Sequence, residues 1–374
     1  MLLPFTFLVM TLAYGLLIGS FKKSWEELPT HAAANSIPWE EFPTVSVIIP
    51  ARNEEKNIGQ LLKALLQQDF PAEKLEIMVV DDHSEDQTAA IVAGFSKVHL
   101  LQLREEGLNS YKKKALEKGV AAACGELIVC TDADCIPTKE WLSELVRNYL
   151  TRDAVFVAAP VVLTNEGSLL GRFQTLDFLV LQGITGAGIQ QGNLSMANGA
   201  NMAYPKKIFE EVEGYRGVDK LASGDDFFLV HKIAKRYPGK IIFVKSPDAI
   251  VKTAALPHWK DFIQQRIRWA SKSASYKEIR MTAVLGLVWF YNALFVWALL
   301  GAMFDWRFAV ILLLAWLLKT LVEWPFVRLV AKFFQVPITL ISFLGFQPLH
   351  IFYTVSTGLL GLTGSYEWKG RKVK

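Results

Sequence analysis

The 374-residue sequence has little of several features on which common protein classes depend. Its three cysteines, Cys124, Cys130 and Cys135, are an odd number crowded around one apolar stretch, so they provide no disulfide framework. We expect them to be small buried side chains rather than redox or metal groups. The six histidines are scattered and give no zinc-type spacing. A net charge of +4 is too small to indicate a nucleic-acid partner.

Charged residues are also scarce, at 20% against 52% hydrophobic residues, and the apolar excess lies at the two ends of the chain. Residues 2–19 are almost uncharged and long enough to span a membrane. Lys22 and Lys23 follow, and positive charge on that side predicts an N-terminus outside and a cytoplasmic exit. A cleaved signal peptide is the alternative, but no basic region precedes the apolar run.

The C-terminal end contains three further apolar segments, 281–304, 308–327 and 336–362. The second carries Lys319 and Glu323, which are four residues apart and could pair on one helical face. Three crossings from a cytoplasmic domain would leave the basic tail outside, against the positive-inside tendency. We therefore expect one segment, the last, to be re-entrant or interfacial, because Gly345 and Pro348 interrupt it.

The middle of the chain alternates apolar strand patterns with helical ones, which predicts a mostly parallel, right-handed α/β sheet. Strands are expected at 45–49, 75–80, 98–103, 127–130 and 154–163, with a last strand at 241–244. Helices are expected at 53–68, 86–94, 111–124, 225–236 and, amphipathic, 258–277. The glycine-rich stretch 165–200 is expected to be irregular and to form the wall of a cleft.

Two acids, Asp132 and Asp134, follow the buried strand 127–130, where ligands collect in open α/β sheets. Two carboxylates so close would repel each other unless a cation lay nearby, and oxygen ligands with substrate phosphates suit Mg²⁺ or Mn²⁺. The alternative is a strand end that is only capped by acids before Pro137.

Five motifs in order resemble a family 2 glycosyltransferase of GT-A fold, in the membrane-integrated branch that includes ceramide glucosyltransferases and polysaccharide synthases. The motifs are Val-Ser-Val-Ile-Ile-Pro-Ala-Arg-Asn-Glu (45–54), Val-Val-Asp-Asp-His-Ser (79–84), Thr-Asp-Ala-Asp (131–134), Gly-Asp-Asp (224–226) and Gln-Arg-Ile-Arg-Trp (265–269). As a set they are specific, although no single motif is. The resemblance implies a GT-A nucleotide-diphospho-sugar transferase: a mostly parallel sheet between helices, with transmembrane helices added.

The resemblance also assigns roles to residues of these motifs. It implies that Asp226, or its neighbour Asp225, is the general base, and that Asp134 with Asp132 holds the metal. The residues expected to bind the nucleotide-sugar are Pro50, Arg52, Glu54, Asp82, Lys114, Asp132, Gln265, Arg268 and Trp269. Lys113 and Lys114 also stand out by themselves, because cations at a helix N-terminus suggest an anionic neighbour such as diphosphate.

Each motif also has a structural interpretation. The acids at 81–82 could form an Asx turn with Ser84, and the acids at 225–226 could only cap a helix. The three lysines could be a solvated basic face. The arginines near 265–269 could reach lipid headgroups from a helix lying on the membrane.

We therefore expect an inverting, Mg²⁺- or Mn²⁺-dependent enzyme of the cell membrane that moves sugar from a nucleotide-diphosphate donor, UDP-sugar first, to a lipid hydroxyl. Alternatives are a processive polysaccharide synthase and an inactive nucleotide-sugar-binding scaffold. The expected parts are a transmembrane helix (1–20), a linker (21–43), a cytoplasmic GT-A domain (44–278) with an interfacial helix (258–278), a membrane region (279–364) and a basic tail (365–374).

Overall fold

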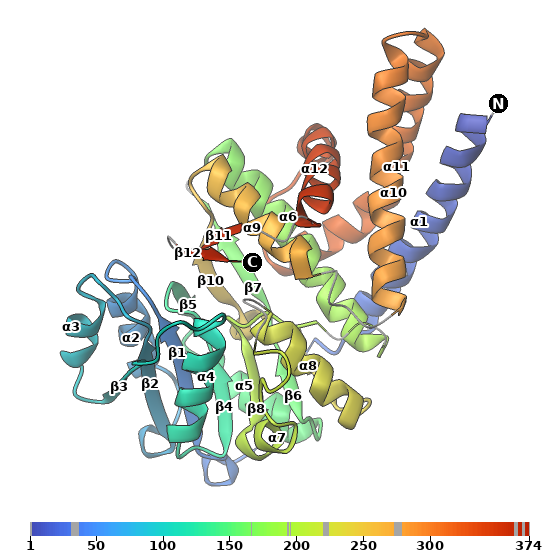
Figure 1. Ribbon diagram of the computed structural model, residues 1–374. Helices are drawn as coiled ribbons and strands as arrows, with labels where there is room; N and C mark the ends of the chain where they lie inside the picture. Colours follow the sequence, from blue (N-terminus) through green and yellow to red (C-terminus); the bar gives the residue numbers. More distant parts are fainter. Residues whose placement is uncertain are drawn as a thin grey trace. The chain divides into compact units, whose positions relative to one another are not determined.

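The computed structural model describes residues 2–30, 37–165, 167–192, 194, 196–219, 224–272, 279–362, 366–368 and 371–373 (Figure 1). The chain forms two compact units, each built from separate stretches of sequence. Unit 1 comprises Met1–Glu27, Glu166–Ala187 and Leu256–Lys374, and unit 2 comprises Leu28–Asn165 and Gly188–Ala255. This division differs from the expected one, because the segment 166–187 and the helix of the fifth motif belong to unit 1.

Unit 2 is built on a seven-stranded sheet of order β3-β2-β1-β4-β8-β6-β9. Its strands are β1 (Val45–Ala51), β2 (Leu75–Asp81), β3 (Val98–Gln102), β4 (Leu127–Cys130), β6 (Phe156–Ala158), β8 (Met202–Pro205) and β9 (Ile241–Phe243). β1, β2, β3 and β4 run parallel, while β8 runs antiparallel to its neighbours β4 and β6. The predicted α/β class with a mostly parallel sheet is confirmed.

Helices cover this sheet and bury its apolar side chains. They are α2 (Ile58–Leu66), α3 (Thr88–Ala93), α4 (Tyr111–Ala122), α5 (Trp141–Thr151), α7 (Lys206–Glu211) and α8 (Asp225–Arg236), with the 3₁₀ turns η1 (Trp39–Glu41), η2 (Ala72–Lys74) and η3 (Pro247–Ala249). α4 packs directly on β1 and β2. A Cβ on Gly119 would lie 2.5 Å from Cγ2 of Ile48, so the close approach of α4 to the sheet requires glycine there.

A second, three-stranded sheet has the order β5-β10-β7 and was only partly expected. Its strands are β5 (Cys135–Pro137), β7 (Val161–Thr164) and β10 (Val251–Ala254). The single strand expected at 154–163 is two strands, β6 and β7, because Pro160 has no N–H to donate to a ladder. β10 lies beyond the strand that was expected to be the last.

Unit 1 is helical. It contains α1 (Leu2–Glu27), α6 (Leu169–Gln190, of which it holds the part to Ala187), α9 (Trp259–Ser271), α10 (Ile279–Ala302), α11 (Trp306–Phe333), α12 (Leu340–Gly361) and the hairpin of β11 (Tyr366–Trp368) and β12 (Arg371–Val373). α1, α10 and α11 pack side by side (Figure 1). Among the described residues, three helical stretches are long and apolar enough to cross a membrane: Leu3–Glu27, Ile279–Ala302 and Trp306–Phe333. In the part of the chain that the structure describes, α12 is not among them.

Several expected boundaries in unit 1 differ from the structure. α1 continues through Lys22 and Lys23, which pair with Glu26 and Glu27 one turn later, so the expected linker begins only after Glu27. The stretch 165–200, expected to be irregular, contains the 22-residue helix α6. Its glycines serve packing: a Cβ on Gly183 would lie 2.6 Å from a methyl carbon of Val330 on α11.

The remaining sequence expectations for the membrane-type helices concern charge and proline. Pro348 does not break α12, which runs through it. The expected pairing of Lys319 with Glu323 is confirmed, with 2.7 Å between Nζ and Oε1 and a fully buried lysine side chain. The same ammonium contacts the amide oxygen of Gln347 at 2.6 Å, so the pair links α11 to α12.

Candidate active site

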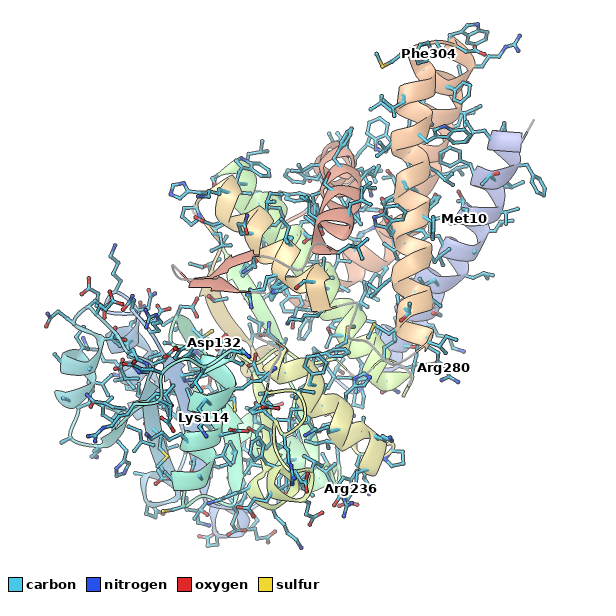
Figure 2. The ribbon with its side chains drawn as sticks, in the orientation of Figure 1. Met10, Lys114, Asp132, Arg236, Arg280 and Phe304 are labelled. Atoms are coloured by element: carbon cyan, nitrogen blue, oxygen red, sulfur yellow. The ribbon has the colours of Figure 1, made fainter. Side chains whose placement is uncertain are left out.

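Four carboxylates of unit 2 gather where β4 ends and α8 begins. Asp132 and Asp134 follow β4 directly, and Figure 2 shows Asp132 beyond the end of that strand. Asp225 and Asp226 form the first turn of α8, which starts after Gly224 at a φ of 83°. That left-handed conformation suits glycine and turns the chain so that both acids enter the helix N-terminus, where the backbone dipole favours negative charge.

Lys112 bridges the two pairs of acids. Its Nζ lies 2.6 Å from Oδ1 of Asp132 and 3.4 Å from Oδ2 of Asp225. Burial alone would lower the pKa of this ammonium, but the nearby carboxylates of Asp132, Asp225 and Asp226 outweigh it, and the pKa is raised. Lys112 therefore stays charged and offsets the repulsion among the acids.

Sequence reasoning singled out Lys113 and Lys114 as partners of an anion such as diphosphate, and did not single out Lys112, which contacts the acids. Lys113 is 2% exposed, donates to the carbonyl of Val218 at 2.8 Å and lies over the ring of Phe228. Lys114, which Figure 2 labels on α4, has its Nζ 3.9 Å from Glu117. Neither contact is with the four acids, so a role for Lys114 in binding the donor stays a prediction.

Gly199 brings the backbone against the acids of α8. Its N–H donates to Oδ2 of Asp226 at 3.2 Å, and the N–H of Phe227 donates to the other oxygen at 2.7 Å. A Cβ on this glycine would lie 2.9 Å from Oδ2 of Asp225 and 3.4 Å from Nζ of Lys112. The close approach fixes the Asp226 carboxylate, which remains partly exposed whereas Asp225 is buried.

Asp134 differs from the other three acids because its side chain is exposed to solvent, whereas theirs are partly or fully buried. Protein atoms crowd around this carboxylate and, together with the charges of Asp132 and Glu54, raise its pKa. Thr253 donates a hydrogen bond to Oδ2 at 3.2 Å. An accessible carboxylate whose charge is disfavoured is a suitable ligand for a cation.

The donor set at this edge fits a divalent cation that completes its shell from the substrate. Within the described residues, no group of three or more His, Cys, Asp or Glu side chains could hold a metal ion alone. Mg²⁺ and Mn²⁺ usually take one or two carboxylates plus substrate phosphates. Asp134 and Asp132 supply that number, although Asp132 already contacts Lys112.

The ends of β1 and β2 form a second part of the site. Asp82 is 3% exposed and its Oδ1 lies 2.9 Å from Nδ1 of His83, whose backbone has a positive φ of 54°. The ring of Tyr111 packs edge-on against the His83 ring, with 5.8 Å between centroids. A buried carboxylate beside two flat rings suits a nucleotide base that accepts stacking by a ring and hydrogen-bonds to the acid.

Arg52, Glu54 and Pro50 shape this part of the site. Arg52 donates to the carbonyls of Asp82 and His83 at 2.9 and 2.8 Å and contacts Glu85 at 3.1 Å, so it holds the loop after β2. Glu54 accepts from Asn57 at 2.7 Å, and Pro50 sits within β1 opposite Val80. Direct contact of these residues with a donor stays a prediction.

The fifth motif lies on α9 in unit 1. Gln265, Arg268 and Trp269 are all partly exposed, and the Trp269 ring packs against Phe178 of α6 with 6.1 Å between centroids. Arg266 lies within this motif, but the resemblance assigns it no role. It is the buried cation of this helix, at 4% exposure. That Gln265, Arg268 and Trp269 act with the acids of unit 2 stays a prediction.

Comparison with known proteins identifies the class. The sequence model of glycosyl transferase family 2 matches residues 46–213. Residues 46–213 thus match the family 2 glycosyltransferase domain, which confirms the predicted resemblance for this part of the chain.

Individual relatives agree with this class. The probable glycosyltransferase YdaM of Bacillus subtilis is 30% identical over 243 residues, which cover 62% of this chain and 55% of the relative. The poly-beta-1,6-N-acetyl-D-glucosamine synthase of Staphylococcus epidermidis is 24% identical over 234 residues, covering 60% and 53%. The chain thus spans about half the length of these curated relatives.

A solved structure supports the fold. The mannosyltransferase PcManGT of Pyrobaculum calidifontis, in complex with GDP-Man and Mn²⁺, superposes with a TM-score of 0.60 at 19% identity, covering 96% of this chain and 97% of that one. At this identity the likeness concerns the fold alone. It confirms the predicted GT-A architecture with added helices.

Proposed function

We propose that the protein transfers a sugar, with inversion, from a nucleotide-diphosphate donor to the hydroxyl of a lipid acceptor. The single observation that carries this proposal is the convergence of Asp132, Asp225 and Lys112 around contacts of 2.6 and 3.4 Å, with Asp134 and Asp226 next to them. These residues come from three separate parts of unit 2, and the residues on α4 and after β4 lie within the stretch that the family model matches. A UDP-sugar is the first donor to test, because the buried Asp82 suits a pyrimidine N–H.

Asp226 is the proposed general base. Its neighbour Asp225 is buried and its Oδ2 lies 3.4 Å from Nζ of Lys112, so that carboxylate already has a cationic partner and is less accessible to an acceptor hydroxyl. Asp226 is partly exposed, and the N–H of Gly199 fixes its orientation. It would take the proton from the acceptor hydroxyl as the new glycosidic bond forms, on the face of the sugar opposite the leaving group.

Asp134 and Asp132 would hold Mg²⁺ or Mn²⁺. When bound, the cation supplies charge that stabilises the departing diphosphate. Lys112 adds a fixed positive charge beside Asp132 and prevents the acids from repelling the phosphates. Asp82 would hydrogen-bond the nucleotide base of the donor, with the rings of His83 and Tyr111 beside it.

The helices of unit 1 support a lipid acceptor and a cell-membrane location. Three of its helices are long and apolar enough to span. Arg280 and Phe304 mark the two ends of α10 in Figure 2, and the basic residue lies on the end that follows α9. With positive charge inside, the family 2 domain would face the cytoplasm, and α12 would not cross. The motif helix α9 then leads almost directly into the bilayer.

The test is transfer from radiolabelled UDP-sugars to a lipid extract, with the purified protein and Mn²⁺. Asp226→Asn should lower kcat by about 10²–10⁴-fold while nucleotide binding is retained. Glu210→Gln, on the exposed surface of α7, is a matched carboxylate control that should leave transfer unchanged. If Asp226→Asn transferred sugar at the wild-type rate, the assigned base would be wrong. If the wild-type protein neither transferred sugar nor hydrolysed any donor, an inactive binding scaffold would replace the proposal.

A processive polysaccharide synthase is the second candidate, favoured by the similarity to the poly-N-acetylglucosamine synthase. The chemistry would be the same, but such an enzyme needs a channel through the membrane. The three helices of the described residues that are long and apolar enough to cross are few for a channel. The product distinguishes the two. A labelled product soluble in organic solvent supports the lipid acceptor, and an insoluble polymer supports the synthase.

A further inference from the structure

Unit 1 contains a buried ion pair, formed by Arg266 of the fifth motif, whose role the proposed function does not explain. Nη2 of Arg266 on α9 lies 2.7 Å from Oδ2 of Asp177 on α6, and both side chains are only 4% exposed. The contact is an ion pair rather than an aligned hydrogen bond. Removing two charges from water costs about as much as their attraction returns, so such a pair contributes little net stability. The pair therefore matters more for the geometry that it fixes than for stability.

The same carboxylate joins α12 to α6 and α9. Tyr353 of α12 donates its hydroxyl proton to Oδ1 of Asp177, and Nε2 of His350 lies 4.0 Å from that oxygen. Around them, Phe173 of α6 and Phe262 of α9 form a buried aromatic core. Asp177 on α6 thus contacts side chains of two other helices, α9 and α12.

Arg266 in turn contacts the motif. Its guanidinium carbon lies 4.2 Å from the centre of the Trp269 ring and 4.9 Å from that of Phe262. A guanidinium stacked on an indole is attracted to the ring face and restricts how the ring can turn. Phe178, next to Asp177 in α6, packs against the same indole. Two consecutive residues of α6 therefore hold Trp269, one directly and one through Arg266.

We propose that Asp177 is a positioning residue: by holding Arg266 it fixes the Trp269 indole and the rotation of α9, and Tyr353 of α12 fixes Asp177. This inference rests on the proposed function only in so far as α9 serves sugar transfer. The arrangement also gives α12 a role, because a helix that is not among the membrane spans secures the motif helix.

The test combines kinetics with hydrogen exchange on the full-length protein. Asp177→Asn keeps the shape of the side chain and removes its charge, so we expect kcat to fall about tenfold or more with donor KM changed less than about threefold. Backbone amides of 259–271 should exchange about fivefold faster, while those of α10 are unchanged. Tyr353→Phe, which keeps the ring and loses one donor, should give a smaller change of the same kind.

A double-mutant cycle separates positioning from general damage. Asp177→Asn combined with Arg266→Gln should lose no more activity than the worse single variant, because both remove one interaction. Asp261→Asn, an exposed acid on the same helix, is the control and should change neither readout. Unchanged exchange over α9 in Asp177→Asn would overturn the inference even if the protein transferred no sugar. So would fully additive losses in the cycle. If the wild-type protein transferred no sugar, but hydrogen exchange in Asp177→Asn changed as expected, only the proposed function would be refuted.

Discussion

Lys112 and Asp132 are 20 residues apart in the sequence, and the ammonium of one lies 2.6 Å from the carboxylate of the other. The contact joins the first turn of α4 to the end of β4, and Asp225 at the start of α8 completes it at 3.4 Å. One cation thus joins two consecutive elements, α4 and β4, to α8, which lies about a hundred residues further along the chain. The acids that the proposed reaction needs can lie close together because this charge is present.

Replacing Lys112 therefore tests the centre of the site. Lys112→Met leaves Asp132 and Asp225 without their shared cation, so we expect transfer to fall by about 10²-fold or more and the donor to bind more weakly. Lys114→Met is the matched comparison, since the Nζ of Lys114 is 3.9 Å from Glu117 and its side chain is 41% exposed, against 25% for Lys112. Its loss should be clearly smaller. A larger loss in Lys114→Met would restore the assignment made from sequence.

Asp134 predicts a dependence of stability on pH. Its pKa is raised, chiefly by the protein atoms that crowd around the carboxylate and then by the charges of Asp132 and Glu54, so the folded protein binds this proton more readily than the unfolded chain. The contribution of Asp134 to stability is therefore present at low pH and is lost as pH rises through the raised pKa. Without added metal, Asp134→Asn should raise Tm at neutral pH and flatten its dependence on pH.

With added Mn²⁺, the wild-type protein rather than Asp134→Asn should have the higher Tm. In the wild-type protein a cation that binds only the folded state raises Tm by mass action, and the gain should shrink as Asp134 becomes protonated. Asp134→Asn should show little gain at any pH. Thermal unfolding with and without Mn²⁺ measures both effects, and an equal Mn²⁺ shift in the two proteins would exclude Asp134 as a ligand.

Gly199 offers a test that changes no charge. In Gly199→Ala the new methyl carbon would lie 2.9 Å from Oδ2 of Asp225, so that carboxylate or the chain must move by several tenths of an ångström. The displaced atom ends a short side chain, so we expect a fall in Tm of a few degrees but a loss of transfer of about tenfold. Gly19→Ala, where a Cβ meets nothing within 4 Å, is the control. Wild-type transfer by Gly199→Ala would show that the acids tolerate this displacement.

The sequence predicted the acids of the site because each follows a strand or opens a helix, positions that a sheet brings to one edge. It did not predict which lysine meets them. Lys113, Leu116 and Val120 recur at helical spacing on the buried face of α4, which would have identified Lys113 as inward-facing. The contact of Lys112 with Asp132 depends on how α4 packs on β1 and β2, and that packing is long-range.

The helix α6 and the split of the chain into two units were missed for a related reason. Glycine has low helix propensity, so 165–200 was expected to be irregular. In the structure Gly183 allows α6 to approach Val330, and this packing outweighs propensity. Asp177 and Arg266 are 89 residues apart in the sequence, so no local sequence pattern could have shown that they pair.

The buried pair on α11 gives the last prediction. Lys319 contacts Glu323 at 2.7 Å and Gln347 at 2.6 Å, inside a helix long and apolar enough to span a membrane. Lys319→Met would leave the Glu323 carboxylate buried without its counter-charge, which typically costs about 3–5 kcal/mol.

Neutralising both partners should cost much less. In the double variant Lys319→Met with Glu323→Gln, the new amide carries no charge and can still hydrogen-bond Gln347 and Tyr14, which both contact Glu323. Lys22→Met removes a comparable i,i+4 pair that is exposed, and should change stability by less than about 0.5 kcal/mol. Thermal unfolding of the four proteins in one detergent measures the series. If Lys319→Met were as stable as Lys22→Met, the buried pair would contribute nothing to holding α12 against α11.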